Sequence, residues 1–249
     1  MYFLLSNLAV QDIILSTITI PKMLAIFLVN SKTVSFNACF AQLGILHSLG
    51  VSEGFFLVVM AFDRYVAICS PLHYMSIMTK RVLIQMTLAS WIIAFVIIVP
   101  PVILAAHLPF CGPDQVSNGF CDHFFVVRLA CTDITLHTDL AFFTVMTLSL
   151  LLSSVVVFSY MKIIVTVLKI NSAEGRKKAF STCSSHLTVI TTYYISGAIT
   201  YSSYKLGSTS DEFHAFGTIF FTILTPTLNP FVYVLRNKEI KSAVKKILK

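Results

Sequence analysis

Two carboxylic acids lie inside otherwise apolar stretches of this chain. Asp12 interrupts the run over residues 1–21, and Glu53 directly follows the charge-free run 33–52. An ionised acid in hydrocarbon costs roughly 2.5 kcal/mol or more unless a partner compensates it. Carboxylate oxygens suit a hard cation. Two interpretations stand side by side: a Na⁺ site at Asp12 and Glu53, or two protonated acids held by hydrogen bonds.

Motifs of catalysis give no support to an enzyme. The chain contains no Walker loop, no HExxH and no CxxC. A transporter would use intramembrane charges and often internal repeats, and two acids without a repeat are thin evidence for one. The residue pattern favours binding and signalling over chemistry.

Composition indicates a membrane protein. Apolar types make up 56% of 249 residues and charged types 12%, whereas a soluble domain carries roughly 25% charged residues. The mean hydropathy is +0.83. Charge-free runs long enough to cross hydrocarbon predict one all-α bundle domain over residues 1–249. Its expected spans are 1–27, 37–69, 82–105, 138–166, 179–204 and 213–235.

The distribution of basic residues sets the orientation. The segments 64–81, 162–178 and 236–249 hold 14 of the 18 lysines and arginines. Positive charge accumulates on the cytosolic side, so both termini are expected there. Topology accounts for the net charge of +7, and nucleic acid need not be a partner.

The cysteines divide between the two sides. Cys69 and Cys183 fall on the cytosolic side, and four others fall at the outer ends of the spans: Cys39, Cys111, Cys121 and Cys131. Disulfides persist in oxidising compartments, and four cysteines allow three pairings. We expect the outer loop, roughly residues 106–138, to be tied to itself and to the helix of Cys39. Free buried thiols are the alternative.

The last segment has a helical apolar face. Its apolar residues recur at helical spacing: Ile240, Ala243, Val244, Ile247 and Leu248. Lysines fill the remainder, which predicts an amphipathic helix over 237–249 lying on an anionic membrane lipid surface. A frayed basic tail is the alternative.

Several runs together carry a family resemblance. They are residues 1–8 (MYFLLSNL), 20–24 (IPKML), 60–74 (MAFDRYVAICSPLHY), 178–187 (KAFSTCSSHL) and 226–238 (PTLNPFVYVLRNK). The chain resembles the odorant receptors, a branch of the rhodopsin-like G-protein-coupled receptors, from Met1 to Lys249. The resemblance implies a rhodopsin-like seven-helix bundle at the plasma membrane. It also implies the disulfides Cys39–Cys121 and Cys111–Cys131.

Departures from the family pattern are few. Phe62 stands where tyrosine is usual, and Tyr193-Tyr194-Ile195 replaces Phe-Tyr-Gly. Met1 aligns with the start of the family's second helix, so six transmembrane helices and the short amphipathic helix are expected, with helix 1 lacking. A truncated gene product, a pseudogene-like copy and a fragmentary gene model are the open explanations.

By resemblance, Asp12 and Glu53 face each other near the bundle axis, and a switch lies at the cytosolic mouth. Arg64 pairs with Asp63 at rest, then releases to contact the heterotrimeric G protein as Tyr160 and Tyr233 move inward. An ordinary interfacial ion pair is the alternative for Arg64. The full switch set is Asp63, Arg64, Tyr65, Tyr160, Asn229, Pro230 and Tyr233.

A ligand cavity is expected in the outer half of the bundle. Counting turns from Cys39 and Arg64 directs Leu46, His47, Gly50 and Val51 inward. The resemblance adds Thr144, Leu148, Tyr194, Gly197, Ala198, Tyr201, Ile219 and Thr222. This mostly apolar wall suits a small volatile molecule with one polar group. No acid lies where an amine receptor would need one, which argues against a cationic transmitter. His47 is the most informative polar residue; a packed histidine with an internal partner is its alternative interpretation.

The expected function is therefore an odorant receptor that binds small volatile organic ligands. It would raise cAMP through a stimulatory G protein of the olfactory type, without a cofactor other than Na⁺. The rival is a non-signalling receptor remnant, and a transporter ranks below both.

Overall fold

The structure is a computed structural model that describes residues 2–31, 33–111, 116, 118–206, 211–224, 226–227 and 229. Its long helices are α1 (Tyr2–Val29), α2 (Phe36–Cys69), α4 (Lys80–Ala106), α6 (Thr135–Leu168) and α7 (Ala173–Leu206). Shorter ones are α3 (Tyr74–Ile77), α5 (His123–Val127), α8 (Asp211–Ile219), a 3₁₀ turn (Pro71–His73) and a π-helical turn (Phe220–Leu224). The described residues contain no strand, and their extended pairing is the isolated bridge Phe110–Ala130.

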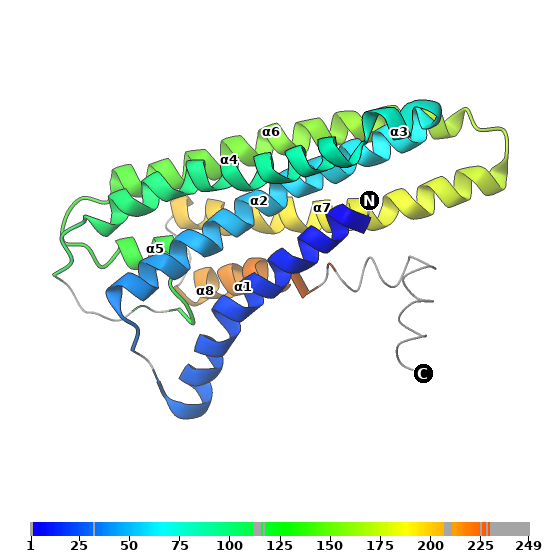
Figure 1. Ribbon diagram of the computed structural model, residues 1–249. Coiled ribbons are helices and arrows are strands. Elements are labelled where there is room, and N and C mark those ends of the chain that lie inside the picture. The colour runs from blue at the N-terminus through cyan, green and yellow to red at the C-terminus, as the bar shows by residue number, and fades with distance from the viewer. Residues whose placement is uncertain are drawn as a thin grey trace.

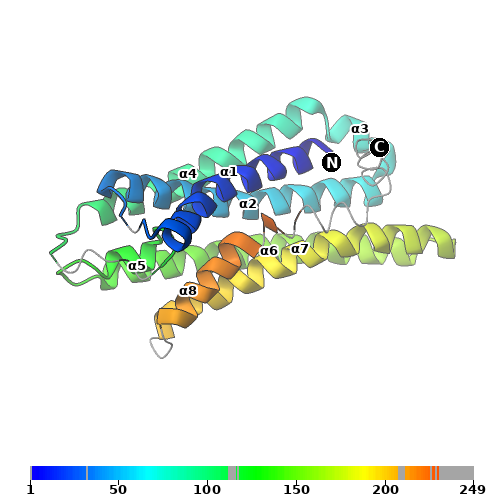
Figure 2. The same cartoon turned by 90° about the horizontal axis from the view of Figure 1, so that it is seen from below.

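Helix α2 is the axis of the bundle. It packs against α4 and α6 along most of its length and also contacts α1 and α7. Figure 1 shows α2, α4 and α6 running side by side, with α1 lying at an angle to them. From below, α1, α2 and α4 form one layer, and α6, α7 and α8 form the other (Figure 2). Groups on α2 are therefore accessible to every other long helix.

Helix α4 exposes its large apolar side chains and buries small or polar ones, the opposite of a helix in a soluble protein. Large apolar side chains four or seven residues apart form an exposed ridge: Ile84, Leu88, Ile92, Val96 and Ile103. Its buried side chains are mostly small or polar: Thr87, Ser90, Ala94, Ile98 and Ala105. Small residues let membrane helices approach closely, while hydrocarbon solvates the apolar ridge. The pattern is that of a helix packed against protein on one face and against lipid on the other.

The main core joins α2 to α1, α6 and α7. Leu4 and Leu8 of α1, Phe56 and Leu57 of α2 and Ile163 of α6 are almost completely buried in it. Phe56 also meets Trp91 of α4 edge-on, with ring centroids 6.3 Å apart. A second cluster around Cys39, Leu43 and Val127 fills the outer end beneath the loop.

The five long helices overlap the expected spans 1–27, 37–69, 82–105, 138–166 and 179–204 and mostly extend further, while α8 and the π-helical turn overlap the partly described range 213–235. Helix α6 exceeds the expected 138–166 at both ends, and α7 begins six residues before 179. Charge-free runs mark the part of a helix that can lie in hydrocarbon, whereas backbone hydrogen bonds continue through the charged residues beyond. Within the described residues, four helices are long and apolar enough to cross a membrane: α1, α2, α4 and α6. The expected amphipathic helix 237–249 lies outside the described residues.

We predict that Phe56→Ala lowers the stability of the bundle. The substitution leaves a cavity at a fully buried position, and such truncations cost about 3–5 kcal/mol. Thermal unfolding in nanodiscs, followed by the fluorescence of the chain's single tryptophan, would give a lower midpoint. Val96→Ala is the control, because Val96 is 67% exposed on the lipid-facing ridge. Equal midpoints for both variants would contradict the assigned core.

Candidate functional site

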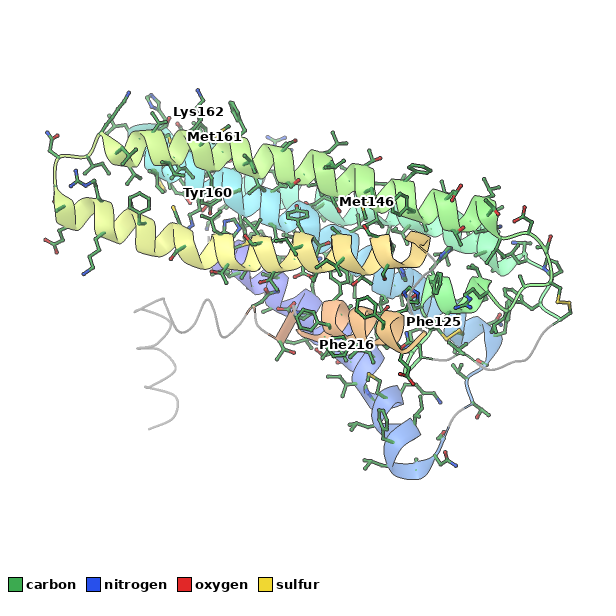
Figure 3. The ribbon with its side chains drawn as sticks, turned by 180° about the vertical axis from the view of Figure 1, so that it is seen from behind. Phe125, Met146, Tyr160, Met161, Lys162 and Phe216 are labelled. Atoms are coloured by element: carbon green, nitrogen blue, oxygen red, sulfur yellow. A yellow bond between two sulfur atoms is a disulfide. The ribbon has the colours of Figure 1, made fainter. Side chains whose placement is uncertain are left out.

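Two disulfides fasten the outer loop over one end of the bundle. Cys39 of α2 bonds Cys121, with Cα atoms 5.4 Å apart, and Cys111 bonds Cys131, with Cα atoms 5.8 Å apart. These are the pairs that the family resemblance implies. The Gln42 side chain also accepts a hydrogen bond of 3.0 Å from the Cys121 backbone N–H. Figure 3 shows the loop helix, with Phe125, at the end of the bundle opposite to Tyr160 and Lys162.

This fastening directs Asp122 into the bundle. One oxygen, Oδ1, accepts the Phe124 backbone N–H at 3.1 Å and caps α5. The other, Oδ2, lies 3.6 Å from Nε2 of His47. Burial raises the pKa of Asp122, and the nearby His47 opposes that shift.

The tautomer of His47 follows from its second contact. Its Nδ1 lies 2.9 Å from the Leu43 carbonyl oxygen, which can only accept, so Nδ1 carries a hydrogen. Nε2 then faces Asp122 and lies 3.6 Å from its Oδ2. His47 and Asp122 therefore form one polar unit.

Two cavities meet at this unit. The outer one, about 230 Å³, is lined by His47, Asp122, His123, Phe124, Thr135, Thr138, Ala141, Phe142 and Tyr201. The inner one, about 70 Å³, is lined by Leu46, His47, Gly50, Val51, Ile98, Asp122, Val145, Tyr193, Thr200, Tyr201, Thr218, Phe221 and Thr222. His47, Asp122 and Tyr201 belong to both linings. The polar groups gather in the outer cavity, and the inner one is mainly apolar.

Half of the expected ligand residues line the inner cavity. They are Leu46, His47, Gly50, Val51, Tyr201 and Thr222. The others are in neither lining: Thr144, Leu148, Tyr194, Gly197, Ala198 and Ile219. Val145, one position after Thr144, faces the cavity instead. Ile219 packs against the cluster of Leu15 and Phe120.

Asp122 overturns one expectation from the sequence. The spans themselves carry no acid in the cavity, but the loop supplies one that is only 4% exposed. The reason is covalent, since residue 122 follows the cysteine that is bonded to the top of α2. The argument against a cationic ligand therefore loses its premise. Adjacency to a cysteine expected to bridge the loop to α2 was the available signal.

Two tyrosines of α7 reach the backbone of α2. The Tyr193 hydroxyl donates to the Gly50 carbonyl at 2.5 Å, and the Tyr194 hydroxyl donates to the Gly54 carbonyl at 3.1 Å. A Cβ on Gly54 would lie 3.2 Å from the Tyr193 oxygen, so glycine permits this approach. The family usually has phenylalanine at the position of Tyr193, and phenylalanine has no hydroxyl to make this bond. Ile195, the other departure there, is 54% exposed and points away from the core.

Residues 50–54 (GVSEG) match the G-x-S-x-G sequence motif of a nucleophile elbow. That motif needs a sharp strand-to-helix turn that exposes the serine. Ser52 instead lies buried inside α2, where it donates to the Leu49 carbonyl at 2.9 Å and accepts from the Gln11 amide. The run therefore has a packing role.

Asn229 brings the two intramembrane acids together. Its Nδ2 donates to Glu53 Oε1 at 2.9 Å and lies 3.4 Å from Asp12 Oδ1. All three side chains are buried. Within the described residues, Asn229 Oδ1 is buried without a hydrogen-bond partner. The same residues contain no group of three His, Cys, Asp or Glu side chains suited to a metal.

The cytosolic end gathers several of the expected switch residues. Tyr160 of α6 bonds Nδ1 of His186 on α7 at 2.7 Å, and Arg64 interacts electrostatically with both. Asp63 accepts the Tyr74 hydroxyl at 2.8 Å, a contact that also helps to raise the pKa of Tyr74 to about 12, after burial as the main cause. Tyr65 stacks on Phe62. Pro230 and Tyr233 lie outside the described residues.

His186 is a polar residue that the sequence did not single out. It occurs in the family run 178–187, and it is 2% exposed beside Tyr160. A histidine inside an otherwise charge-free span was the signal that could have marked it, because such a group needs an internal partner.

These features define a class of protein. Helices with lipid-facing ridges, polar groups collected on a central helix and a disulfide-tied loop over a small cavity form a rhodopsin-like membrane receptor. The family model described as olfactory receptor matches residues 1–249. The chain therefore belongs to the olfactory receptor family.

Individual relatives agree over almost the whole chain. Olfactory receptor 2AT4 of Homo sapiens is 44% identical over 248 residues, which is 100% of this chain and 77% of the relative. Olfactory receptor 4E2 of Homo sapiens is 44% identical, with 99% and 78% covered. Olfactory receptor 4B13 of Mus musculus is 42% identical, with 98% and 79% covered. The protein is a multi-pass odorant receptor of the plasma membrane, not an enzyme, and its family requires no cofactor.

We predict that His123 makes the outer loop less stable in acid. Burial, with His47 and His137 nearby, lowers the pKa of His123 to about 3, against about 6.5 in an unfolded chain. Below pH 6.5 the unfolded state binds more protons, so stability falls as the pH falls towards 3. Lowering the pH from 6.5 to 5 should cost about 1.5 kcal/mol through this residue.

Thermal unfolding of the receptor and of His123→Gln at the two pH values measures that contribution. The variant should lose less stability than the parent on acidification. His107→Gln is the control, because His107 lies exposed at the start of the same loop. An equal acid response in the parent and in His123→Gln would show that His123 does not remain neutral in the folded loop.

Proposed function

We propose that this odorant receptor binds small volatile organic molecules beneath the disulfide-tied loop. We further propose that it raises cAMP through a stimulatory G protein of the olfactory type. The observation that carries the first part is the pair of cavities sharing His47, Asp122 and Tyr201. The apolar inner cavity suits a hydrocarbon body, and the shared residues supply hydrogen-bonding groups for one polar end.

Contacts at the cytosolic end support the coupling to a G protein. Arg64 interacts electrostatically with Tyr160, Cys183 and His186. The Tyr160–His186 hydrogen bond joins α6 to α7 beside it. A rotation of α7 would break this bond and change the surroundings of Arg64, which makes a two-state element.

The loop after α2 supplies an apolar surface for the same partner. Leu72 is 94% exposed and Met75 is 81% exposed, close in the chain to Arg64. Exposed apolar side chains on an otherwise charged cytosolic face favour a protein contact. The basic residues of the cytosolic segments would attract anionic lipid and orient that face towards the leaflet.

We predict that Arg64→Ala abolishes the odorant-dependent rise in cAMP and leaves odorant binding largely intact. The substitution removes the charge that acts on Tyr160 and His186 without altering a cavity-lining residue. A cAMP reporter with a ligand-binding assay on the same cells measures both. Arg81→Ala is the control, as it removes an exposed cytosolic arginine at the start of α4. Undiminished cAMP from Arg64→Ala would remove Arg64 from the switch.

We also propose that Asp12 and Glu53 hold a Na⁺ ion in the resting receptor. Two carboxyl groups and the amide oxygen of Asn229, which has no partner among the described residues, offer hard oxygen ligands in one buried place. A cation there would offset the charges that burial otherwise disfavours. Two protonated acids bonded through Asn229 are the competing arrangement.

We predict that replacing Na⁺ by choline strengthens odorant binding several-fold, and that Asp12→Asn removes this effect. Na⁺ can shift the receptor towards rest only if it binds the resting state more tightly. Odorant dissociation constants at constant ionic strength measure the effect. Parent binding that is equally tight in Na⁺ and choline would favour the protonated pair.

A further inference from the structure

The outer cavity offers a kind of binding that the inner cavity does not. Asp122 contributes a carboxyl group, and Thr135, Thr138 and Tyr201 contribute hydroxyls. Phe124 and Phe142 form aromatic parts of the same wall. An acid beside aromatic rings is the environment that recognises an organic cation, since both the charge and the ring faces attract it.

The existing partners of Asp122 leave room for a stronger one. Its Oδ1 accepts a backbone N–H at 3.1 Å. Its Oδ2 lies 3.6 Å from Nε2 of His47, beyond the 2.7–2.9 Å of roughly ideal charge-assisted hydrogen bonds. An ammonium group in the cavity can approach Oδ2 more closely than the imidazole does.

Burial raises the pKa of Asp122 and so favours its neutral form, but a cation in the cavity would lower that pKa again. The other titratable groups nearby add little charge. Burial keeps His123 neutral, with a pKa of about 3. His214 is buried and bonded to Ser203, and His137 is buried at the start of α6. Arg128 lies over the Phe124 ring, with its guanidinium carbon 5.1 Å from the centroid, but it is exposed and water screens its charge.

We propose that the outer cavity binds a small primary amine in its protonated form, with Asp122 as the counter-ion. The proposal rests on the proposed function, because it names a ligand class for the same site. A cavity of about 150 Å³ holds benzene, so 230 Å³ admits an aromatic ring with a short amino substituent. A carboxylic acid of the same size is rejected, because it would bring a second negative charge against Asp122.

Direct binding to the receptor in nanodiscs tests the proposal without requiring a signal. Benzylamine and benzyl alcohol serve as probes that share size and shape and differ in charge. Asp122→Asn removes the charge but keeps the cap on α5, because asparagine caps as well as aspartate. Asp133→Asn is the matched control: Asp133 belongs to the same loop and is exposed.

We expect Asp122→Asn to raise the benzylamine dissociation constant at least tenfold and to change that of benzyl alcohol less than about twofold. Asp133→Asn should change neither. Absence of benzylamine binding to the parent receptor would overturn the proposal. Equal losses for both probes, or an unchanged benzylamine constant in Asp122→Asn, would do the same. Binding without any cAMP response would contradict the proposed signalling alone and leave the amine site in place.

Discussion

Hydrocarbon offers no hydrogen bonds, so each polar group inside the membrane needs a partner within the protein. In this receptor several of these partners meet on α2. Glu53 accepts a hydrogen bond from Asn229, Ser52 accepts one from Gln11, and the Gly50 carbonyl accepts one from the Tyr193 hydroxyl of α7. Each contact fixes the rotation of a neighbouring helix about its own axis, which apolar packing alone does not do. Helix α2 carries Gly50, Gly54 and Glu53, and these polar contact points hold the neighbouring helices in one arrangement.

The outer end is fastened by covalent bonds because water competes there for hydrogen bonds. The Cys39–Cys121 disulfide joins the loop to α2 at a point only two helical turns from His47. Residue 122 has little freedom once residue 121 is bonded, and its carboxyl group is carried over the cavity. One cross-link thereby supplies both the lid of the site and its acid. The chemistry of the site depends on the fastening as much as on the helices.

The sequence predicted the positions of the long helices, the side of the membrane on which each cysteine lies, and the inward face of α2. These predictions have physical reasons. Charge-free runs and compartment rules are properties of a segment by itself. Helix α2 carried two fixed points, Cys39 and Arg64, so counting turns between them directed Leu46 and His47 into the cavity lining. Helix α6 had no such anchor, and Thr144 was chosen where Val145 lines the cavity. Successive residues on a helix are rotated by about 100°. An error of one position therefore selects a side chain that points away from the cavity. Asp122 was missed because its approach depends on the loop path.

The two tyrosine bonds between α7 and α2 link the cavity to the cytosolic end. Tyr193 lines the inner cavity and bonds Gly50, and His186 lies seven residues earlier on α7, about 10 Å away at 1.5 Å per residue. There it bonds Tyr160 beside Arg64. Because a helix is stiff over two turns, a ligand that rotates α7 at Tyr193 also disturbs the His186 contact. Each hydrogen bond contributes about 1 kcal/mol net, so a differential binding energy of a few kcal/mol suffices to shift the population. The family's phenylalanine would lack the first of these bonds, so the hydroxyl of Tyr193 adds a restraint on α7 to the proposed switch.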